Sequence, residues 1–182
     1  MLHIKLFPAE YGDCIILSIG KESQYNILID GGLSKTYHKY IKAEIQHIKE
    51  LGQKIGLMVC THMDNDHICG LIQVLKGTNF NFIENVWYNG FLQIVNSRFY
   101  SQKENIFTEK DNKILDEIIS QGMLLDVDQE VGINEGMSLG VLIEERRIPL
   151  NSAARGQAIC SELVKNKYEI APSIFITILG PS

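Results

Sequence analysis

The chain has 182 residues, of which 45% are hydrophobic and 21% charged, and its 17 basic and 22 acidic side chains give a formal net charge of −5. This length corresponds to about one domain with a substantial core, which excludes a disordered tail or a scaffold that needs disulfides or metal to fold. The acidic excess argues against a general nucleic-acid coat protein, because such a protein needs excess positive charge.

The first residues of the chain alternate between polar and apolar types and lack the apolar region and cleavage site of a secretory signal. The longest apolar runs, such as 14–17 and 174–179, have the length of strands and are far too short to span a membrane. We therefore expect a cytoplasmic protein without membrane association. Four cysteines without a CxxC pair are predicted to be reduced and mostly buried thiols: Cys14, Cys60, Cys69 and Cys160.

Three short strands are predicted at the start of the chain, over residues 2–7, 13–19 and 25–29. These runs are rich in β-branched and aromatic residues and are separated by turns that contain glycine. The chain is therefore expected to open as a β-meander.

Helices and strands are predicted to alternate after the meander. Ser34 can cap a helix whose apolar residues follow helical spacing, and Gly52 is placed to end it. A strand over 55–61, a short helix over 68–76 and a strand over 82–88 follow. This order predicts an α/β layered fold with a partly mixed sheet.

Residues 101–145 contain eleven acidic side chains and three lysines, so their local net charge is −8. We interpret this segment as an acidic insertion or surface region, with one helical stripe of apolar residues over 114–119. Ser152 can cap a further helix over 153–166, and residues 173–179 are predicted to form a terminal strand.

Four potential metal ligands lie within six residues directly after the fourth strand: His62, Asp64, Asp66 and His67. A loop at this position can fold all four side chains inward together. Imidazole nitrogen and carboxylate oxygen suit Zn²⁺, Mn²⁺ or Fe²⁺, and the absence of cysteine from the cluster disfavours a closed structural zinc site. The cluster therefore predicts a catalytic metal site rather than a polar turn.

The HxDxDH spacing resembles the signature of the metallo-β-lactamase fold, in the variant where aspartate replaces the second histidine. The flanking residues are similar to the ComEC-like branch of that family: GDCIIL at 12–17, NILIDGG at 26–32, and THMDNDHICG at 61–70, which resembles its THxDxDHxxG segment. The resemblance is strong over residues 1–90 and looser over 151–182, and it does not extend to the acidic segment.

This resemblance implies an αββα sandwich in which residues 1–182 form a single but incomplete domain, about the first half to two-thirds of the family fold. It implies two metal sites, with Zn²⁺ as the expected metal, His62 and Asp64 at the first site, and Asp66 and His67 at the second. Asp66 is also expected to be needed for catalysis, and Asp30 is expected to orient a ligand without binding metal. The implied reaction is hydrolysis by a metal-bound hydroxide, with phosphodiester bonds of nucleic acid or nucleotides as the expected substrate.

The sequence departs from the family after His67, because no histidine follows it, whereas the family completes its site with a later Gly-Asp motif and later histidines. We expect a further C-terminal segment or a second chain to complete the sheet and the metal site. The isolated chain is then expected to bind metal weakly, to be inactive and to self-associate through an uncovered apolar sheet face. A non-catalytic subunit or binding module that keeps only the first metal motif is the alternative, and thioester hydrolysis also stays open.

Overall fold

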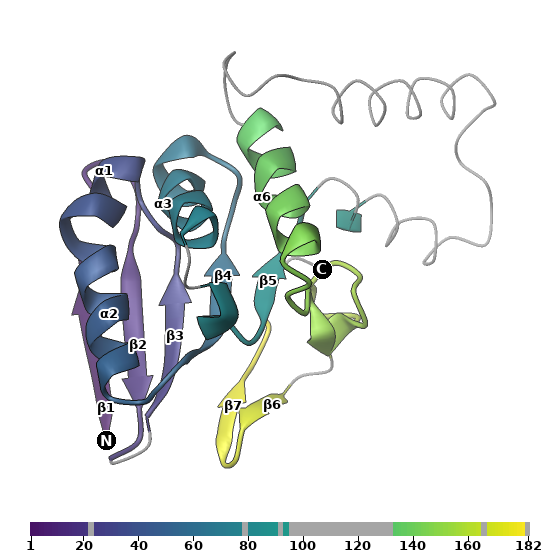
Figure 1. Ribbon diagram of the computed structural model, residues 1–182. Coiled ribbons are helices and arrows are strands. Elements are labelled where there is room, and N and C mark those ends of the chain that lie inside the picture. The colour runs from purple at the N-terminus through teal and green to yellow at the C-terminus, as the bar shows by residue number, and fades with distance from the viewer. Residues whose placement is uncertain (22–23, 78–79, 91–92, 95–132, 165–166, 181–182) are drawn as a thin grey trace.

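A five-stranded sheet forms the centre of the molecule (Figure 1). The computed structural model describes residues 1–182 except 22–23, 78–79, 91–92, 95–132, 165–166 and 181–182. The strands lie in chain order: β1 (Leu2–Leu6), β2 (Ile15–Ile19), β3 (Tyr25–Ile29), β4 (Ile55–Cys60) and β5 (Val86–Tyr88). β1, β2 and β3 pair antiparallel, whereas β3, β4 and β5 are parallel. The predicted meander and the mixed α/β class are confirmed.

Helices cover one face of this sheet (Figure 1). They are α1 (Ser34–Thr36), a π-helical segment (Tyr37–Ile41), α2 (Lys42–Glu50), α3 (Asn65–Lys76), a short 3₁₀ helix (Phe80–Phe82) and α6 (Ile133–Glu145). The first three are continuous and confirm the predicted helix, and Gly52 follows it with a φ of +70°. The capping role predicted for Ser34 is wrong, because Ser34 is the first helical residue and Leu33 is the N-cap. None of the helices in the described part of the chain is long and apolar enough to cross a membrane.

The two sheet faces bury different partners, because side chains alternate along each strand. Toward the helices, Ile16, Leu28 and Met58 share a core with residues such as Leu71 of α3 and Leu139 of α6. The opposite face buries side chains of β3, β4 and β5 against the C-terminal segment, in a cluster that includes Ile27, Leu57, Trp87, Ile159 and Val164. A hairpin of β6 (Tyr168–Ala171) and β7 (Ile174–Ile176) contributes to this second layer.

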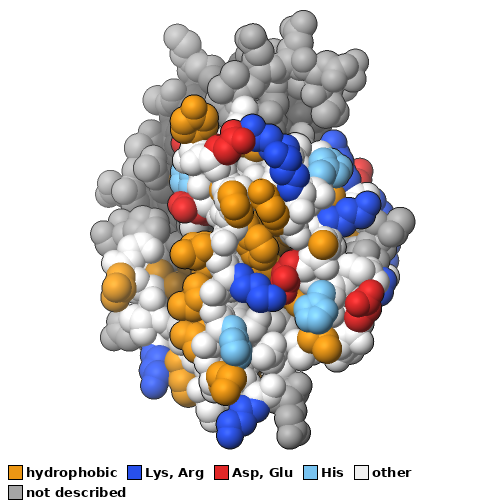
Figure 2. All heavy atoms as spheres, turned by 90° about the vertical axis from the view of Figure 1, so that its left-hand side faces the viewer, with side chains coloured by type: hydrophobic (Ala, Val, Ile, Leu, Met, Phe, Trp, Pro, Cys, Tyr) orange, Lys and Arg blue, Asp and Glu red, His pale blue; other side chains and the backbone are white. Residues whose placement is uncertain are grey.

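The edge strand β1 leaves part of this second face uncovered. Leu2, Ile4 and Leu6 pair with alternate residues of β2 and are 56%, 58% and 74% exposed. Figure 2, which views the molecule from the left-hand side of Figure 1, shows a band of hydrophobic side chains on this side. An exposed apolar row on an edge strand is a typical site of association with another chain.

The C-terminal elements differ from the sequence prediction. The helix predicted over 153–166 is wrong, because Ser152–Ala154 forms only one 3₁₀ turn. Asn151 and Arg155 flank this turn with φ values of 47° and 55°, a left-handed conformation that a longer right-handed helix cannot include. The predicted terminal strand is confirmed in part as β7, and the strand predicted over 82–88 is reduced to β5.

The end of the acidic segment is part of the core. Residues 133–145 form α6, which packs against α3 and buries Leu139 and Ile143. A surface position is therefore wrong for these two side chains. The stripe predicted over 114–119 and most of the acidic insertion lie outside the described residues.

The end of β3 and helix α3 approach each other backbone to backbone. The Gly31 N–H donates to the His67 carbonyl at 2.7 Å, and the Gly70 N–H donates to the Gly32 carbonyl at 2.9 Å. A Cβ atom at Gly70 would lie only 1.8 Å from the Gly31 carbonyl oxygen. Glycine inside a helix lowers stability by up to about 1 kcal/mol relative to alanine. Position 70 nevertheless requires glycine, because a side chain there would collide with the backbone of Gly31.

We expect Gly70→Ala to lower the free energy of unfolding by about 1–3 kcal/mol, because the added methyl group forces the two backbones apart. Gly140→Ala is the matched control in α6, where an added Cβ meets its nearest neighbour, the Tyr88 ring, at 4.0 Å. This control should be neutral or more stable by up to about 1 kcal/mol. Urea unfolding followed by circular dichroism compares the variants, and equal stabilities would contradict the proposed close approach.

Candidate metal centre

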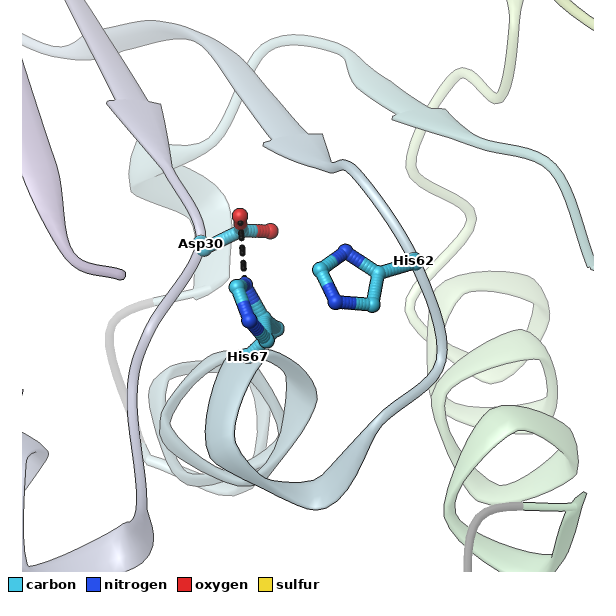
Figure 3. Close-up of side chains that lie close together, drawn as sticks. All are labelled: Asp30, His62 and His67. Carbon is cyan, nitrogen blue, oxygen red and sulfur yellow. Dashed lines mark hydrogen bonds and ion pairs between the residues drawn. The ribbon is translucent and has the colours of Figure 1, made fainter. Parts of the chain in front are cut away.

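The candidate metal ligands gather at one edge of the sheet, where β3 and β4 end and α3 begins (Figure 3). Asp30 follows β3 with a left-handed φ of 53°. His62 lies two residues after β4. Helix α3 begins at Asn65 rather than at the predicted Ile68, so His67 projects from its first turn instead of from a loop.

Asp30 is a buried carboxylate whose two oxygens are occupied by protein donors. Its side chain is 1% exposed. Oδ1 accepts the Thr61 backbone N–H at 2.8 Å, and Oδ2 accepts the Thr61 hydroxyl at 2.5 Å. Oδ2 also lies 2.9 Å from Nδ1 of His67. These contacts offset the cost of burying the charge and hold the imidazole in one orientation.

The hydrogen bonds define which ring nitrogen carries the proton in each histidine. An ionised Asp30 can only accept, so Nδ1 of His67 must donate to it. The single hydroxyl proton of Thr61 is also directed at Asp30, so the Thr61 oxygen must accept from Nδ1 of His62 at 2.9 Å. In the neutral form of each imidazole, Nε2 then carries no proton and can bind a metal ion.

The two imidazoles converge with Asp30 (Figure 3). Ligand atoms of Asp30, His62 and His67 lie within 4.8 Å of one another, and the two ring centroids are 3.7 Å apart. The side chain of His67 is 9% exposed and that of His62 is 48% exposed. The Asp30 and His67 side chains of the cluster are therefore buried, and the cluster is open to solvent on the His62 side.

Asp64 and Asp66 lie at the rim of this cluster, each beside one histidine. Oδ2 of Asp64 is 3.7 Å from Nε2 of His62, and Oδ2 of Asp66 is 3.9 Å from Nε2 of His67. Two ligands of a tetrahedral zinc ion at its usual bond lengths are separated by about 3.3 Å. Each pair therefore needs only a small side-chain movement to share one cation.

The structure groups the residues differently from the sequence motif. It brings Asp30 into the tight cluster with His62 and His67, whereas Asp64 is 75% exposed and Asp66 is 28% exposed. Thr61 was not predicted as part of the site, although it adjoins His62 in the motif. Thr61 belongs to the site because it hydrogen-bonds to Asp30, which is 31 positions away in the chain and therefore lies outside the local motif.

The charge of Asp30 contributes to the pKa shifts of two buried thiols, Cys14 and Cys60. Burial raises the pKa of Cys14 to about 12, and the charge of Asp30 contributes to this shift. The same two causes raise the pKa of Cys60, whose Sγ donates to the His62 carbonyl at 3.1 Å. Both remain protonated at neutral pH, and their burial confirms the prediction of buried thiols for this pair.

Comparisons with known proteins do not identify the chain, because no protein-family model and no curated protein matches it significantly. A functional hypothesis therefore depends on the geometry of these residues and on the motifs that they form.

We expect both His62 and His67 to be the tautomer with a proton on Nδ1 and none on Nε2. Long-range ¹H–¹⁵N NMR correlations of metal-free protein at pH 8 distinguish the two tautomers. Thr61→Val removes the hydroxyl with little change of shape, so it should release the tautomer of His62 and leave that of His67 unchanged. A proton on Nε2 of His67 in the parent protein would refute the assignment.

Alkylation should separate the buried thiols from a partly exposed one. At pH 8 iodoacetamide should modify Cys160 and leave Cys14 unmodified, because the thiolate is the reactive form and burial of Cys14 raises its pKa. Peptide mass spectrometry measures both sites. Unfolding in urea is the control and should make both reactive, and rapid labelling of native Cys14 would contradict its burial.

Proposed function

We propose that this chain is a metal-dependent hydrolase of the metallo-β-lactamase type that acts on phosphodiester bonds of nucleic acid or nucleotides. The observation that carries the proposal is the convergence of His62 and His67, whose Nε2 atoms lie 3.7 and 3.9 Å from an oxygen of Asp64 and Asp66, respectively. Nitrogen and carboxylate ligands in an open site are typical of catalytic rather than structural metal centres.

The residues fit two divalent cations, with Zn²⁺ favoured and Mn²⁺ or Fe²⁺ as alternatives. His62 and Asp64 would hold one ion, and Asp66 and His67 would hold the other. Ions held there would lower the pKa of a bound water and stabilise the charge that develops on the attacked group.

The protein's own groups would prepare the site in three ways. Asp30 accepts a hydrogen bond from the Nδ1–H of His67 and thereby increases the basicity of Nε2. Asp66 is partly exposed, so its carboxylate is accessible from solvent. The positive end of the α3 dipole lies at the site and favours an anionic group such as a phosphate. The choice of phosphodiesters among family substrates rests on the ComEC-like motifs.

Completion of the site by a further segment or a second chain is part of this proposal. The exposed row of Leu2, Ile4 and Leu6 on β1 supports such an association or self-association. A non-catalytic binding module that keeps only the first metal motif is the competing proposal.

Metal binding and hydrolysis, measured in parallel, test the proposal. Calorimetry with Zn²⁺ should show binding at two sites, of which His67→Ala and Asp66→Ala abolish only the one that those two residues form, and Asp30→Asn should weaken that same site by about 10–100-fold. The exposed His47 of α2 lies outside the site, so His47→Ala is the control and should bind like the parent protein.

Hydrolysis of bis(p-nitrophenyl) phosphate should follow the same order of variants, in the purified chain or in the complex with any polypeptide that copurifies with it. Zinc binding without hydrolysis in both preparations would favour the binding module. Unchanged zinc binding in His67→Ala and Asp66→Ala would overturn the metal assignment itself.

A further inference from the structure

A second candidate site lies at the opposite end of the sheet from the metal cluster. A partly open cavity of about 160 Å³ is found where β3, β4, β5 and β6 begin. It is large enough for a small organic molecule. Its lining residues are Tyr25, Gly56, Leu57, Glu84, Asn85, Trp87, Tyr168 and Ile170.

Three aromatic side chains from different strands form much of its wall. The rings of Trp87 and Tyr168 are 6.0 Å apart between centroids, at an interplanar angle of 56°. The Tyr25 ring lies directly over Gly56, where a Cβ atom would be 2.1 Å from a ring carbon. The glycine thus makes room for the ring, and the three aromatic rings supply π-systems whose faces carry negative electrostatic potential.

The polar groups of the wall also attract positive charge. Glu84 contributes a half-exposed carboxylate, which Nζ of Lys54 approaches to 3.1 Å. Nδ2 of Asn85 donates to Ser152, whereas its Oδ1 is buried and has no hydrogen-bond partner among the described residues. Burial and the nearby charge of Glu84 raise the pKa of Tyr25 to about 12, so its phenol stays neutral.

We propose that this cavity binds a small organic ammonium ion. Aromatic faces attract cations, Glu84 supplies an opposite charge, and Oδ1 of Asn85 offers an acceptor for an N–H or O–H donor. Lys54 already places an ammonium group on Glu84 and competes with the ligand at the rim. This site shares no residue with the metal cluster, so the proposal is independent of the hydrolase proposal.

Choline and its neutral analogue 3,3-dimethylbutan-1-ol test the proposal, because they have the same shape and differ in charge. Trp87 is the only tryptophan of the chain, so its fluorescence reports directly on the cavity. Choline should change this fluorescence saturably at low ionic strength and should bind at least about tenfold more tightly than the neutral analogue. Equal concentrations of sodium chloride correct for ionic strength.

Two rim variants should change the affinity for choline in opposite directions. Glu84→Gln should weaken binding about threefold or more, whereas Lys54→Met should tighten it, because the competing ammonium is removed. Glu144→Gln on α6 makes the same chemical change outside the cavity and should have no effect. The absence of a saturable signal, equal binding of the two probes, or unchanged affinity in Glu84→Gln would each overturn the proposal.

Discussion

The backbone contact between Gly31 and Gly70 is the constraint on which the candidate metal centre depends. It brings the end of β3 against the first turns of α3 with no side chain between them. Asp30 precedes this contact and His67 belongs to the turn that accepts the Gly31 N–H, so their 2.9 Å interaction follows from it. A larger residue at either glycine would separate the carboxylate from the imidazole and leave a buried charge without its partner, which is strongly destabilising.

A single threonine hydroxyl extends this arrangement to the second histidine. Thr61 satisfies Asp30 through both its N–H and its O–H, and its oxygen then accepts from Nδ1 of His62. When Asp30 is ionised, this one buried carboxylate sets the tautomers of both neutral imidazoles. The same charge contributes to the raised pKa values of Cys14 and Cys60, so the neighbouring thiols stay protonated while the imidazoles are prepared as ligands.

The parallel pairing of β3, β4 and β5 separates the two candidate sites. The residues that follow β3 and β4 meet at one edge of the sheet, where helix α3 contributes His67. The residues that begin these strands meet at the other edge, where the β6–β7 hairpin contributes Tyr168 to the aromatic cavity. The polar metal cluster and the aromatic cavity therefore face different solvent regions, so each can be altered without changing a residue of the other.

Local patterns in the sequence determined the strands 2–6, 15–19, 25–29 and 55–60, the helix from Ser34, and the chemical type of the His62–His67 motif. Strand alternation and helical spacing are properties of neighbouring residues, so they can be recognised without the fold. The tertiary structure alone decided that α3 begins at Asn65, that residues 133–145 pack against α3, and that 153–166 do not form a helix. It also decided that Asp30 bonds Thr61 and His67, because these contacts join residues 31 and 37 positions apart. Such pairs are set by sheet order and by the steric fit of two glycines, neither of which a local pattern contains.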